Sequence, residues 1–112
     1  MGRKTAKQLE ADYQAQLIQR LTILFPGCHI VINDPQITQG IPDLLILFQN
    51  HWAMLEVKPS ADAKLQPNQD YYVDWFDNMS FAAFIYPENE EDVLHDLQQA
   101  FSPAPSARVA VR

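Results

Sequence analysis

Two apolar runs separated by a short polar turn constrain the fold of this chain most strongly. Residues 43–49 are almost unbroken in Leu, Ile and Phe, and residues 52–58 form a second run of strand length. Such runs are typical of strands that are covered on both faces. Asn50 and His51 lie between them and fit a two-residue hairpin turn. We therefore expect an antiparallel hairpin in the interior of the fold.

This hairpin would bring three charged side chains together on one face. With the turn at 50–51, Asp43 falls opposite Lys58. Directly paired residues lie roughly 4.5 to 5.5 Å apart at Cβ, and diagonal neighbours roughly 7 to 8 Å apart. Glu56 is such a diagonal neighbour of Asp43, because side chains alternate between the faces of a strand. The hairpin register therefore predicts a cluster of Asp43, Glu56 and Lys58, provided that no bulge shifts it.

The composition of this cluster indicates a metal site. Two carboxylates at this spacing repel each other unless one is protonated or both share a cation, and carboxylate oxygens are preferred ligands of Mg²⁺. Lys58 can orient or help deprotonate an attacking water, or neutralise charge at a phosphorus centre. The cluster is therefore typical of a metal-dependent phosphodiesterase. The alternative is a surface salt bridge between Lys58 and a carboxylate at a strand end.

A further carboxylate comes from a helix predicted over Thr5 to Phe25. Thr5 fits the N-cap, and Gln8 completes a capping box. The apolar stripe of this helix consists of Leu9, Tyr13, Leu17, Leu21 and Leu24. At about 100° per residue, Glu10 falls within the stripe, whereas Asp12 points into solvent. A carboxylate in that position needs a cationic or metallic partner; alternatively, Glu10 is a hydrated first-turn acid that the helix dipole favours.

Gln69 faces inward from a second predicted helix. Pro67 fits the first turn of this helix. Its apolar stripe consists of Tyr72, Trp75, Phe76 and Met79. Gln69 lies on the same side, so its amide must find partners. Those partners are a site carboxylate or a substrate phosphate, or else a strand end that Gln69 caps.

The remaining segments complete an α/β fold. Residues 28–33 and 81–86 read as strands, and Asn89 fits the N-cap of a last helix. The residues of that helix that face the core are Val93, Leu94, Leu97 and Phe101. The expected order is α-β-β-β-α-β-α, a small mixed β-sheet flanked by helices. We assign residues 1–101 to one domain and residues 102–112 to a flexible tail whose two arginines can touch DNA.

The order of these motifs resembles the PD-(D/E)xK nuclease superfamily. The helix with Glu10 is followed by Gly40-Ile41-Pro42-Asp43, by Glu56-Val57-Lys58, and by residues 65–69 before an aromatic helix. The chain is most similar to small stand-alone, phage-type VRR-NUC nucleases, and more distantly to Holliday-junction resolvases. The likeness spans roughly residues 5 to 101. Ile41 departs from it, because related sequences often carry a basic or polar residue there.

The resemblance implies a restriction-endonuclease-like core that hydrolyses DNA phosphodiester bonds with Mg²⁺ or Mn²⁺. Asp43 and Glu56 would be the metal ligands, joined by the backbone carbonyl of Val57. Lys58 would be the catalytic lysine. The products would carry a 5′ phosphate and a 3′ hydroxyl.

Other polar residues would support this reaction. By the same resemblance, Glu10 would act in catalysis and reach the metal directly or through a water, and Gln69 would be a supporting catalytic residue. Gln39 and Gly40 precede the Asp43 strand, and Lys64 precedes the Gln69 helix. We expect these three residues to contact substrate.

Composition sets limits on this interpretation. With 112 residues, 47% of them hydrophobic, the chain suits one compact domain. No stretch approaches the roughly 18 apolar residues of a membrane span, and the polar N-terminus is no secretory signal. We expect a cytoplasmic protein, in a bacterial host cell if its origin is a phage. The single cysteine, Cys28, excludes an internal disulfide, and no zinc spacing occurs.

The net charge of −6 is the main objection to a nuclease, because DNA-binding surfaces are usually basic. The acids concentrate near the last helix, at Glu88, Glu90, Glu91, Asp92 and Asp96, whereas Arg3, Lys4 and Lys7 cluster at the N-terminus. An acidic run is also typical of a solvated helix start. The alternative function is a non-catalytic acidic module, a decayed nuclease that binds nucleic acid or a DNA-processing protein.

So short a chain has no elements for long sequence readout. We therefore expect structure-selective cutting of branched DNA such as four-way junctions. A homodimer would supply two active sites about a two-fold axis. The rings of Tyr71, Tyr72, Trp75 and Phe76 exceed what one helix stripe needs. Some of these rings form part of that interface, or else all four line the core or a groove. We expect no small-molecule organic cofactor.

Overall fold

The computed structural model describes residues 2–102, which form a four-stranded mixed sheet with three helices. In chain order the elements are α1 (Ala6–Leu24), β1 (His29–Ile32), β2 (Leu44–Phe48), β3 (His51–Val57), α2 (Gln69–Met79), β4 (Phe81–Ile85) and α3 (Glu90–Phe101). This order confirms the predicted α/β class. Apart from Ser102, the predicted tail lies outside the described residues. Within residues 2–102, no helix is both long and apolar enough to cross a bilayer.

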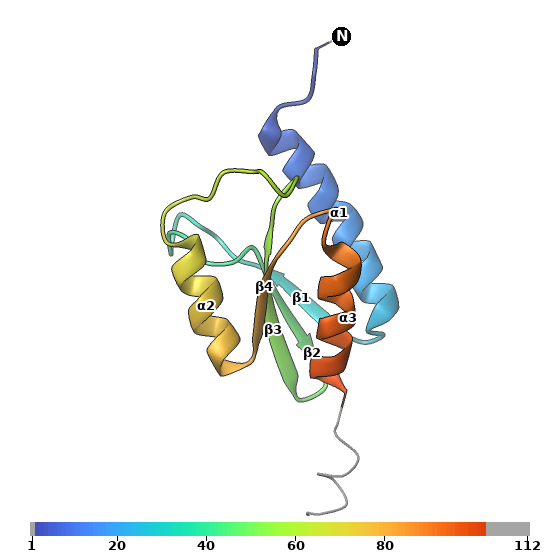
Figure 1. Ribbon diagram of the computed structural model, residues 1–112. Helices are drawn as coiled ribbons and strands as arrows, with labels where there is room; N and C mark the ends of the chain where they lie inside the picture. Colours follow the sequence, from blue (N-terminus) through green and yellow to red (C-terminus); the bar gives the residue numbers. More distant parts are fainter. Residues whose placement is uncertain (1, 103–112) are drawn as a thin grey trace, which may run out of the picture.

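The sheet is the middle of three layers (Figure 1). Its strand order is β1-β2-β3-β4, with β1–β2 and β2–β3 antiparallel and β3–β4 parallel. Helices α1 and α3 cover one face, and α2 covers the other. The last pair is parallel because α2 serves as the crossover from β3 to β4. Strand β3 therefore has both faces covered, as its apolar run requires. The prediction is wrong for one face of β2, because α2 lies over β3 and β4: on that side Leu45 is half-buried and Leu47 is 40% exposed.

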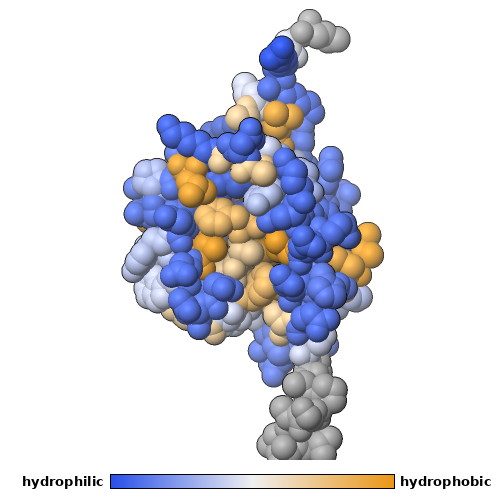
Figure 2. Space-filling model, in the orientation of Figure 1, coloured by the Kyte–Doolittle hydropathy of each residue, from blue (hydrophilic) through white to orange (hydrophobic). Residues whose placement is uncertain are grey.

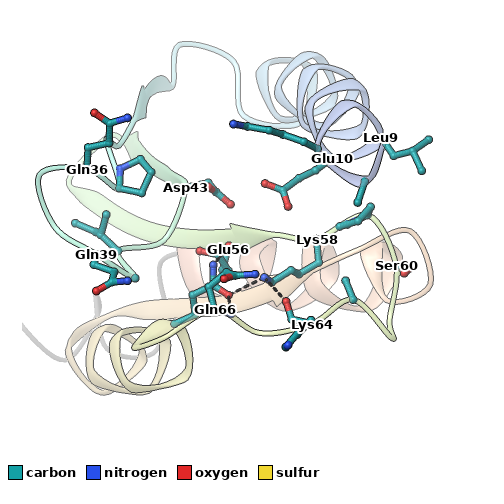
Figure 3. A pocket seen from close by; sticks show the side chains of 18 residues that line it. Leu9, Glu10, Gln36, Gln39, Asp43, Glu56, Lys58, Ser60, Lys64 and Gln66 are labelled. Atoms are coloured by element: carbon teal, nitrogen blue, oxygen red, sulfur yellow. Dashed lines mark hydrogen bonds between the residues drawn. The ribbon is translucent and has the colours of Figure 1, made fainter. Parts of the chain in front are cut away.

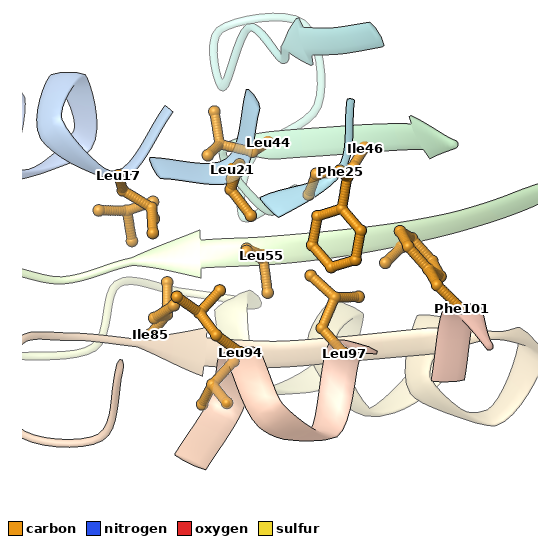
Figure 4. Close-up of a cluster of buried hydrophobic side chains, with 13 residues drawn as sticks. Leu17, Leu21, Phe25, Leu44, Ile46, Leu55, Ile85, Leu94, Leu97 and Phe101 are labelled. Carbon is orange, nitrogen blue, oxygen red and sulfur yellow. The ribbon is translucent and has the colours of Figure 1, made fainter. Parts of the chain in front are cut away.

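Each face of the sheet has its own hydrophobic cluster. The larger one lies under α1 and α3 and includes Leu17, Leu21, Phe25, Leu44, Ile46, Leu55, Ile85, Leu94, Leu97 and Phe101 (Figure 4). All four core-facing residues expected of α3 are buried, which confirms that prediction. The smaller cluster lies under α2 and consists of Met54, Val73 and Ala82 with partly buried neighbours. Burial of each large apolar side chain contributes about 1.5–3 kcal/mol, so the first cluster carries most of the stability.

The hairpin between β2 and β3 forms, but its turn lies one residue earlier than predicted. Phe48 pairs with His51, so Gln49 and Asn50 make the turn, and Gln49 takes a left-handed φ of 57°. His51 belongs to β3 because its ring stacks on Phe101 of α3, with centroids 5.7 Å apart. The predicted pairing of Asp43 with Lys58 is therefore wrong.

The correction leaves the charged side chains on one face. Leu44 pairs with Leu55, so the same register extended by one residue sets Asp43 beside Glu56. Lys58 then becomes the diagonal neighbour of Asp43. The residue beside Asp43 is thus Glu56 and not Lys58, two positions earlier in the chain. A shift of two positions keeps every side chain on its original face of the sheet.

Helix α1 begins as predicted. Thr5 is its N-cap, and the capping box with Gln8 is present in both directions, at 2.8 and 3.1 Å. The apolar stripe is buried at Leu17 and Leu21, but Leu9 is 48% exposed. The first turns of α1, to which Leu9 belongs, extend beyond the end of the sheet (Figure 1).

Helix α2 differs from its prediction at its start and in its buried face. It begins at Gln69 after Asn68, so Pro67 lies outside the first turn. The inward face consists of Gln69, Tyr72, Val73 and Phe76, while two residues of the predicted stripe, Trp75 and Met79, are 46% and 54% exposed. The buried stripe is thus rotated toward Gln69, whose side chain bonds to Glu56 of β3 and to Lys58 just after it.

Strand β4 forms one edge of the sheet, and side chains cover part of that edge. Asp77 accepts a hydrogen bond from the N–H of Ala82 at 3.0 Å. Asn89 accepts one from the N–H of Tyr86 at 2.9 Å and donates one to the carbonyl of Phe84 at 3.0 Å. Asn89 is the N-cap residue of α3, but its side chain makes no cap bond, so the predicted capping role is wrong. Figure 2 shows apolar side chains gathered over β4 between the polar surfaces of α2 and α3.

Candidate metal and phosphate site

Asp43 is fixed at the entrance to β2 by the strands on both sides. Its backbone carbonyl accepts a hydrogen bond from Asn33 at 2.8 Å, and its Oδ2 accepts one from the N–H of Val57 at 2.8 Å. Asp43 follows the buried Pro42, and it is itself half-buried. A carboxylate held by a backbone N–H keeps one orientation, and here that orientation is toward Glu56 on the neighbouring strand.

Glu56 is the most deeply buried carboxyl group of the site, and its pKa is strongly raised. It is 1% exposed, and its Oε2 accepts a hydrogen bond from the amide of Gln69 at 3.0 Å. Its Oε1 is buried and has no hydrogen-bond partner. Burial, followed by the nearby Asp43 carboxylate, raises the pKa of Glu56 to about 9; Glu10 adds to the rise and Lys58 opposes it. Without a cation, Glu56 therefore holds a proton at neutral pH.

Lys58 is buried behind this pair and held from two directions. The side chain is 5% exposed and donates hydrogen bonds to Gln69 Oε1 at 2.6 Å and to the carbonyl of Lys64 at 3.2 Å. An ammonium group has three donors, so one remains for a substrate. Gln69 thus joins Lys58 to Glu56, and it also accepts a hydrogen bond from the N–H of Gln66 at 2.8 Å. Of the partners that the sequence left open for the Gln69 amide, the structure shows a carboxylate of the site, that of Glu56.

Glu10 approaches the same site from α1. Burial raises its pKa, and the Asp43 carboxylate raises it further, while Lys58 and Lys7 lower it. Its carboxylate points toward Asp43 and Glu56 from the opposite wall (Figure 3). Asp12 is exposed, as predicted, and it also pairs with Lys4, which the sequence did not predict.

A polar bridge to α3 sets the orientation of α1. The Tyr13 hydroxyl donates to Glu90 Oε1 at 2.7 Å, and Arg20 pairs with both Glu90 and Glu91. Burial and the hydrogen bond to Glu90 raise the pKa of Tyr13, so the hydroxyl stays a donor. Tyr13 lies one turn after Glu10, and the bridge therefore helps hold Glu10 over the site. Sequence reasoning missed this bridge, because its partners lie about 70 residues apart and carry no local signal.

These side chains line one open cleft of about 850 Å³ (Figure 3). The residues predicted for the site that line it are Glu10, Gln39, Gly40, Asp43, Glu56, Lys58, Lys64 and Gln69. Val57 contributes its backbone N–H to Asp43, and its side chain lies in the core. Lys7, which the sequence analysis placed only in the basic N-terminal cluster, also lines the cleft. Further lining residues that the sequence analysis did not assign to the site include Gln36, Ser60 and Gln66. These three lie in loops, whose packing leaves no periodic signal in the sequence.

The position of Gly40 closes one wall of the cleft. Its φ is +90°, and a Cβ there would lie 2.6 Å from Asn68 Cβ and 2.7 Å from the carbonyl oxygen of Pro67. Asn68 also has a left-handed φ, of 70°. Two left-handed turns thus pack the loop before β2 directly against the start of α2, which carries Gln69.

The donor set fits a hard divalent cation. The orphaned, buried Oε1 of Glu56 beside Asp43 is an uncompensated acceptor that such an ion would satisfy. Among residues 2–102, no three or more His, Cys, Asp and Glu side chains form a group that could hold a metal, so Glu10 does not complete such a set. Mg²⁺ is commonly bound by one or two carboxylates, with waters and substrate oxygens as the other ligands. Two carboxylates are therefore sufficient for Mg²⁺ or Mn²⁺.

No family model, curated protein or solved structure matches the chain. The resemblance to PD-(D/E)xK nucleases therefore stays a prediction. Its support is the set of side chains that the fold gathers around the cleft.

Proposed function

We propose that this protein is a divalent-metal-dependent endonuclease of the PD-(D/E)xK type, with a restriction-endonuclease-like core, that hydrolyses phosphodiester bonds of branched DNA such as four-way junctions. The observation that carries the proposal is the buried pair Asp43 and Glu56, with the unpartnered Glu56 Oε1, next to a lysine held by an amide. A salt bridge at a strand end does not account for it, because Lys58 bonds to Gln69 and Lys64 instead of a carboxylate.

Each residue of the site would have its own role in phosphodiester hydrolysis. Asp43, Glu56 and the backbone carbonyl of Val57 would hold Mg²⁺ or Mn²⁺, which when bound polarises a phosphodiester and lowers the pKa of a nearby water. Lys58 would donate its free N–H to the attacking water or to a phosphate oxygen and so offset developing negative charge. Gln69 keeps both Lys58 and Glu56 in place.

The cleft also addresses the objection from net charge. Its lining includes three lysines, Lys7, Lys58 and Lys64, and three carboxylates, Glu10, Asp43 and Glu56. The formal charges of these side chains balance, so the formal net charge of −6 comes from the rest of the chain. With Glu56 protonated, the lining of the metal-free cleft carries a small net positive charge. A divalent cation would make the cleft more positive within an acidic surface, and phosphate would be attracted to the cleft alone.

We extend the proposal to a homodimer that uses the outer face of α2. Tyr71, Trp75 and Met79 are 60%, 46% and 54% exposed along this face. Tyr72 and Phe76 are partly buried and belong to the core side of the same helix. A dimer would supply the two active sites that symmetric cutting of a junction needs.

The nuclease proposal is tested with labelled four-way junction, flap, linear duplex and single-stranded DNA in Mg²⁺, Mn²⁺ or EDTA. We expect cutting that needs the metal and falls by at least about a hundredfold in Asp43→Ala and Lys58→Ala. Asp96→Asn, which removes an exposed carboxylate of α3, is the control and should cut like wild type. Folded wild-type protein that cuts none of these substrates would overturn the proposal in favour of the acidic binding module.

A further inference from the structure

The face of the sheet that carries the carboxylates continues onto β4 as aromatic side chains. In the parallel β3–β4 register Glu56 pairs with Phe84 and Val57 with Ile85. The same register extended by one residue sets Tyr86 beside Lys58. Neighbouring strands lie about 4.8 Å apart. Two aromatic rings therefore stand one strand away from the proposed metal ligand and the proposed catalytic lysine, on the same face.

A second hollow, of about 240 Å³, opens at these rings. It is lined by Lys58, Ser60, Ala61, Ala63, Leu65, Phe84 and Tyr86. Lys58, Ser60 and Ala63 also line the large cleft, so the two hollows adjoin at the segment that follows β3. A hollow of this size is large enough for one planar base.

The walls of this hollow suit a nucleobase. Phe84 and Tyr86 are only half-buried, so part of each ring is open to a ligand. Three small residues, Ser60, Ala61 and Ala63, also line the hollow, which leaves room for a flat group. No lining residue is acidic, and one, Lys58, is cationic. The Glu88 carboxylate lies beside the hollow, where it accepts a hydrogen bond from the N–H of Ala61 at 3.2 Å.

We propose that this hollow, here called the base pocket, binds one unpaired nucleobase next to the phosphate that is held at Asp43, Glu56 and Lys58. The inference rests on the proposed function and deepens it, because it names the substrate feature that the protein selects. A base can enter only where it is not paired in a duplex, which is easiest in single strands and at branch points. Stacking on aromatic side chains tolerates any base, so the preference is for structure and not for sequence.

Binding measured without cleavage tests the base pocket. The protein is prepared in the Asp43→Asn background, and fluorescence anisotropy follows two labelled oligomers of about twelve units, oligothymidylate and an abasic strand of equal charge. We expect the strand with bases to bind about tenfold more tightly. Tyr86→Ala should reduce this gain to less than about twofold while leaving affinity for the abasic strand unchanged.

Two further variants keep the test decisive. Ile23→Ala removes an exposed apolar side chain of α1 that lines neither hollow and lies outside the proposed dimer face, and it should keep the full gain. Ala61→Leu fills the base pocket from an exposed position, so it removes the gain even where Tyr86→Ala fails to fold. Equal binding of the two oligomers, or a gain that survives both Tyr86→Ala and Ala61→Leu, would overturn the proposal.

The outcome is separable from that of the nuclease assay. Base-dependent binding in a protein that cuts no DNA would keep the base pocket and overturn the nuclease. Cutting that is indifferent to Tyr86→Ala, by a protein that binds both oligomers equally, would keep the nuclease and overturn the base pocket.

Discussion

At the scale of single residues, the buried carboxyl group of Glu56 lowers the stability of the folded protein. A buried carboxyl with one oxygen unpartnered lowers stability unless it is protonated or bound to a cation. Gln69 satisfies only the other oxygen. A structural role alone would be served better by an amide, so the carboxylate is best explained by what it binds.

Glu56 makes the stability of the metal-free protein depend on pH. Its pKa is about 9 in the folded state and 4.5 as the ordinary value, so between these pH values the folded protein holds a proton that the unfolded chain has released. Stability is then full below about pH 4.5 and falls as pH rises toward about 9. Glu56→Gln removes this dependence. In EDTA we expect its melting temperature to exceed that of wild type at about pH 8.5 by on the order of 5 °C, and to match wild type at about pH 4.5.

Thermal unfolding in EDTA across this pH range measures the effect. Asp96→Asn, at an exposed position of α3, should follow the wild-type profile. Mg²⁺ at about pH 8.5 should raise the melting temperature of wild type more than that of Glu56→Gln. Parallel pH profiles for wild type and Glu56→Gln would contradict the assignment.

At the scale of elements, local sequence signals predicted which segments fold and where helices begin. The capping box at Thr5 and Gln8 and the spacing from Val93 to Phe101 are local, and both predictions are confirmed. The turn predicted at 50–51 was wrong, and so was the inward placement of Trp75 and Met79, whereas Gln69, Tyr72 and Phe76 face inward as predicted. Both differences involve contacts between distant segments: His51 stacks on Phe101, and Gln69 bonds to Lys58 and Glu56.

In the candidate site too, local periodicity was predictable, whereas contacts between distant segments were not. The period of two along β2 and β3 was enough to place Asp43, Glu56 and Lys58 on one face, even with the turn misplaced by one residue. The unpartnered oxygen of Glu56 and the packing of Gly40 depend on contacts between distant segments. Such contacts leave no periodic trace in the sequence, so only the folded chain reveals them.

The contact of Gly40 with the start of α2 predicts a difference between two glycine substitutions. Gly40 and Gly27 both have a left-handed φ, +90° and +88°, but a Cβ at Gly27 would meet nothing within 4 Å. Gly27→Ala should therefore cost only the backbone strain, about 1 kcal/mol. Gly40→Ala also pushes against Asn68 and should cost a further 1–3 kcal/mol, by an order-of-magnitude estimate.

Urea unfolding of the two variants measures this difference in free energy, and Gly27→Ala is the matched control. Because Gly40 packs against Asn68, the residue before Gln69, Gly40→Ala should also displace Gln69 and lower nuclease activity, while Gly27→Ala leaves it near wild type. Equal free energies of unfolding for the two variants would show that the close contact with Asn68 is not rigid.

At the scale of the whole molecule, acidic surface surrounds a cleft of balanced charge. Among residues 2–102, the cations that line the cleft are Lys7, Lys58 and Lys64, and we expect these three to neutralise most of the bound phosphates. Lys4 pairs with Asp12 and does not line the cleft. The number of phosphates neutralised should therefore be small, in contrast to proteins that bind along a basic groove.

Salt dependence of binding measures that number. For single-stranded DNA each neutralised phosphate contributes a slope of about −0.7 to log K against log salt concentration, so three lysines predict a slope of about −2. Lys7→Ala and Lys64→Ala should each weaken binding and flatten the slope by about 0.7, whereas Lys4→Ala should change neither. The measurement is anisotropy of a labelled single strand, in the Asp43→Asn background, from about 50 to 300 mM KCl. A slope near −6, or an equal effect of Lys4→Ala, would mean that DNA contacts surfaces outside the cleft, because the cleft has too few cations to release so many counterions.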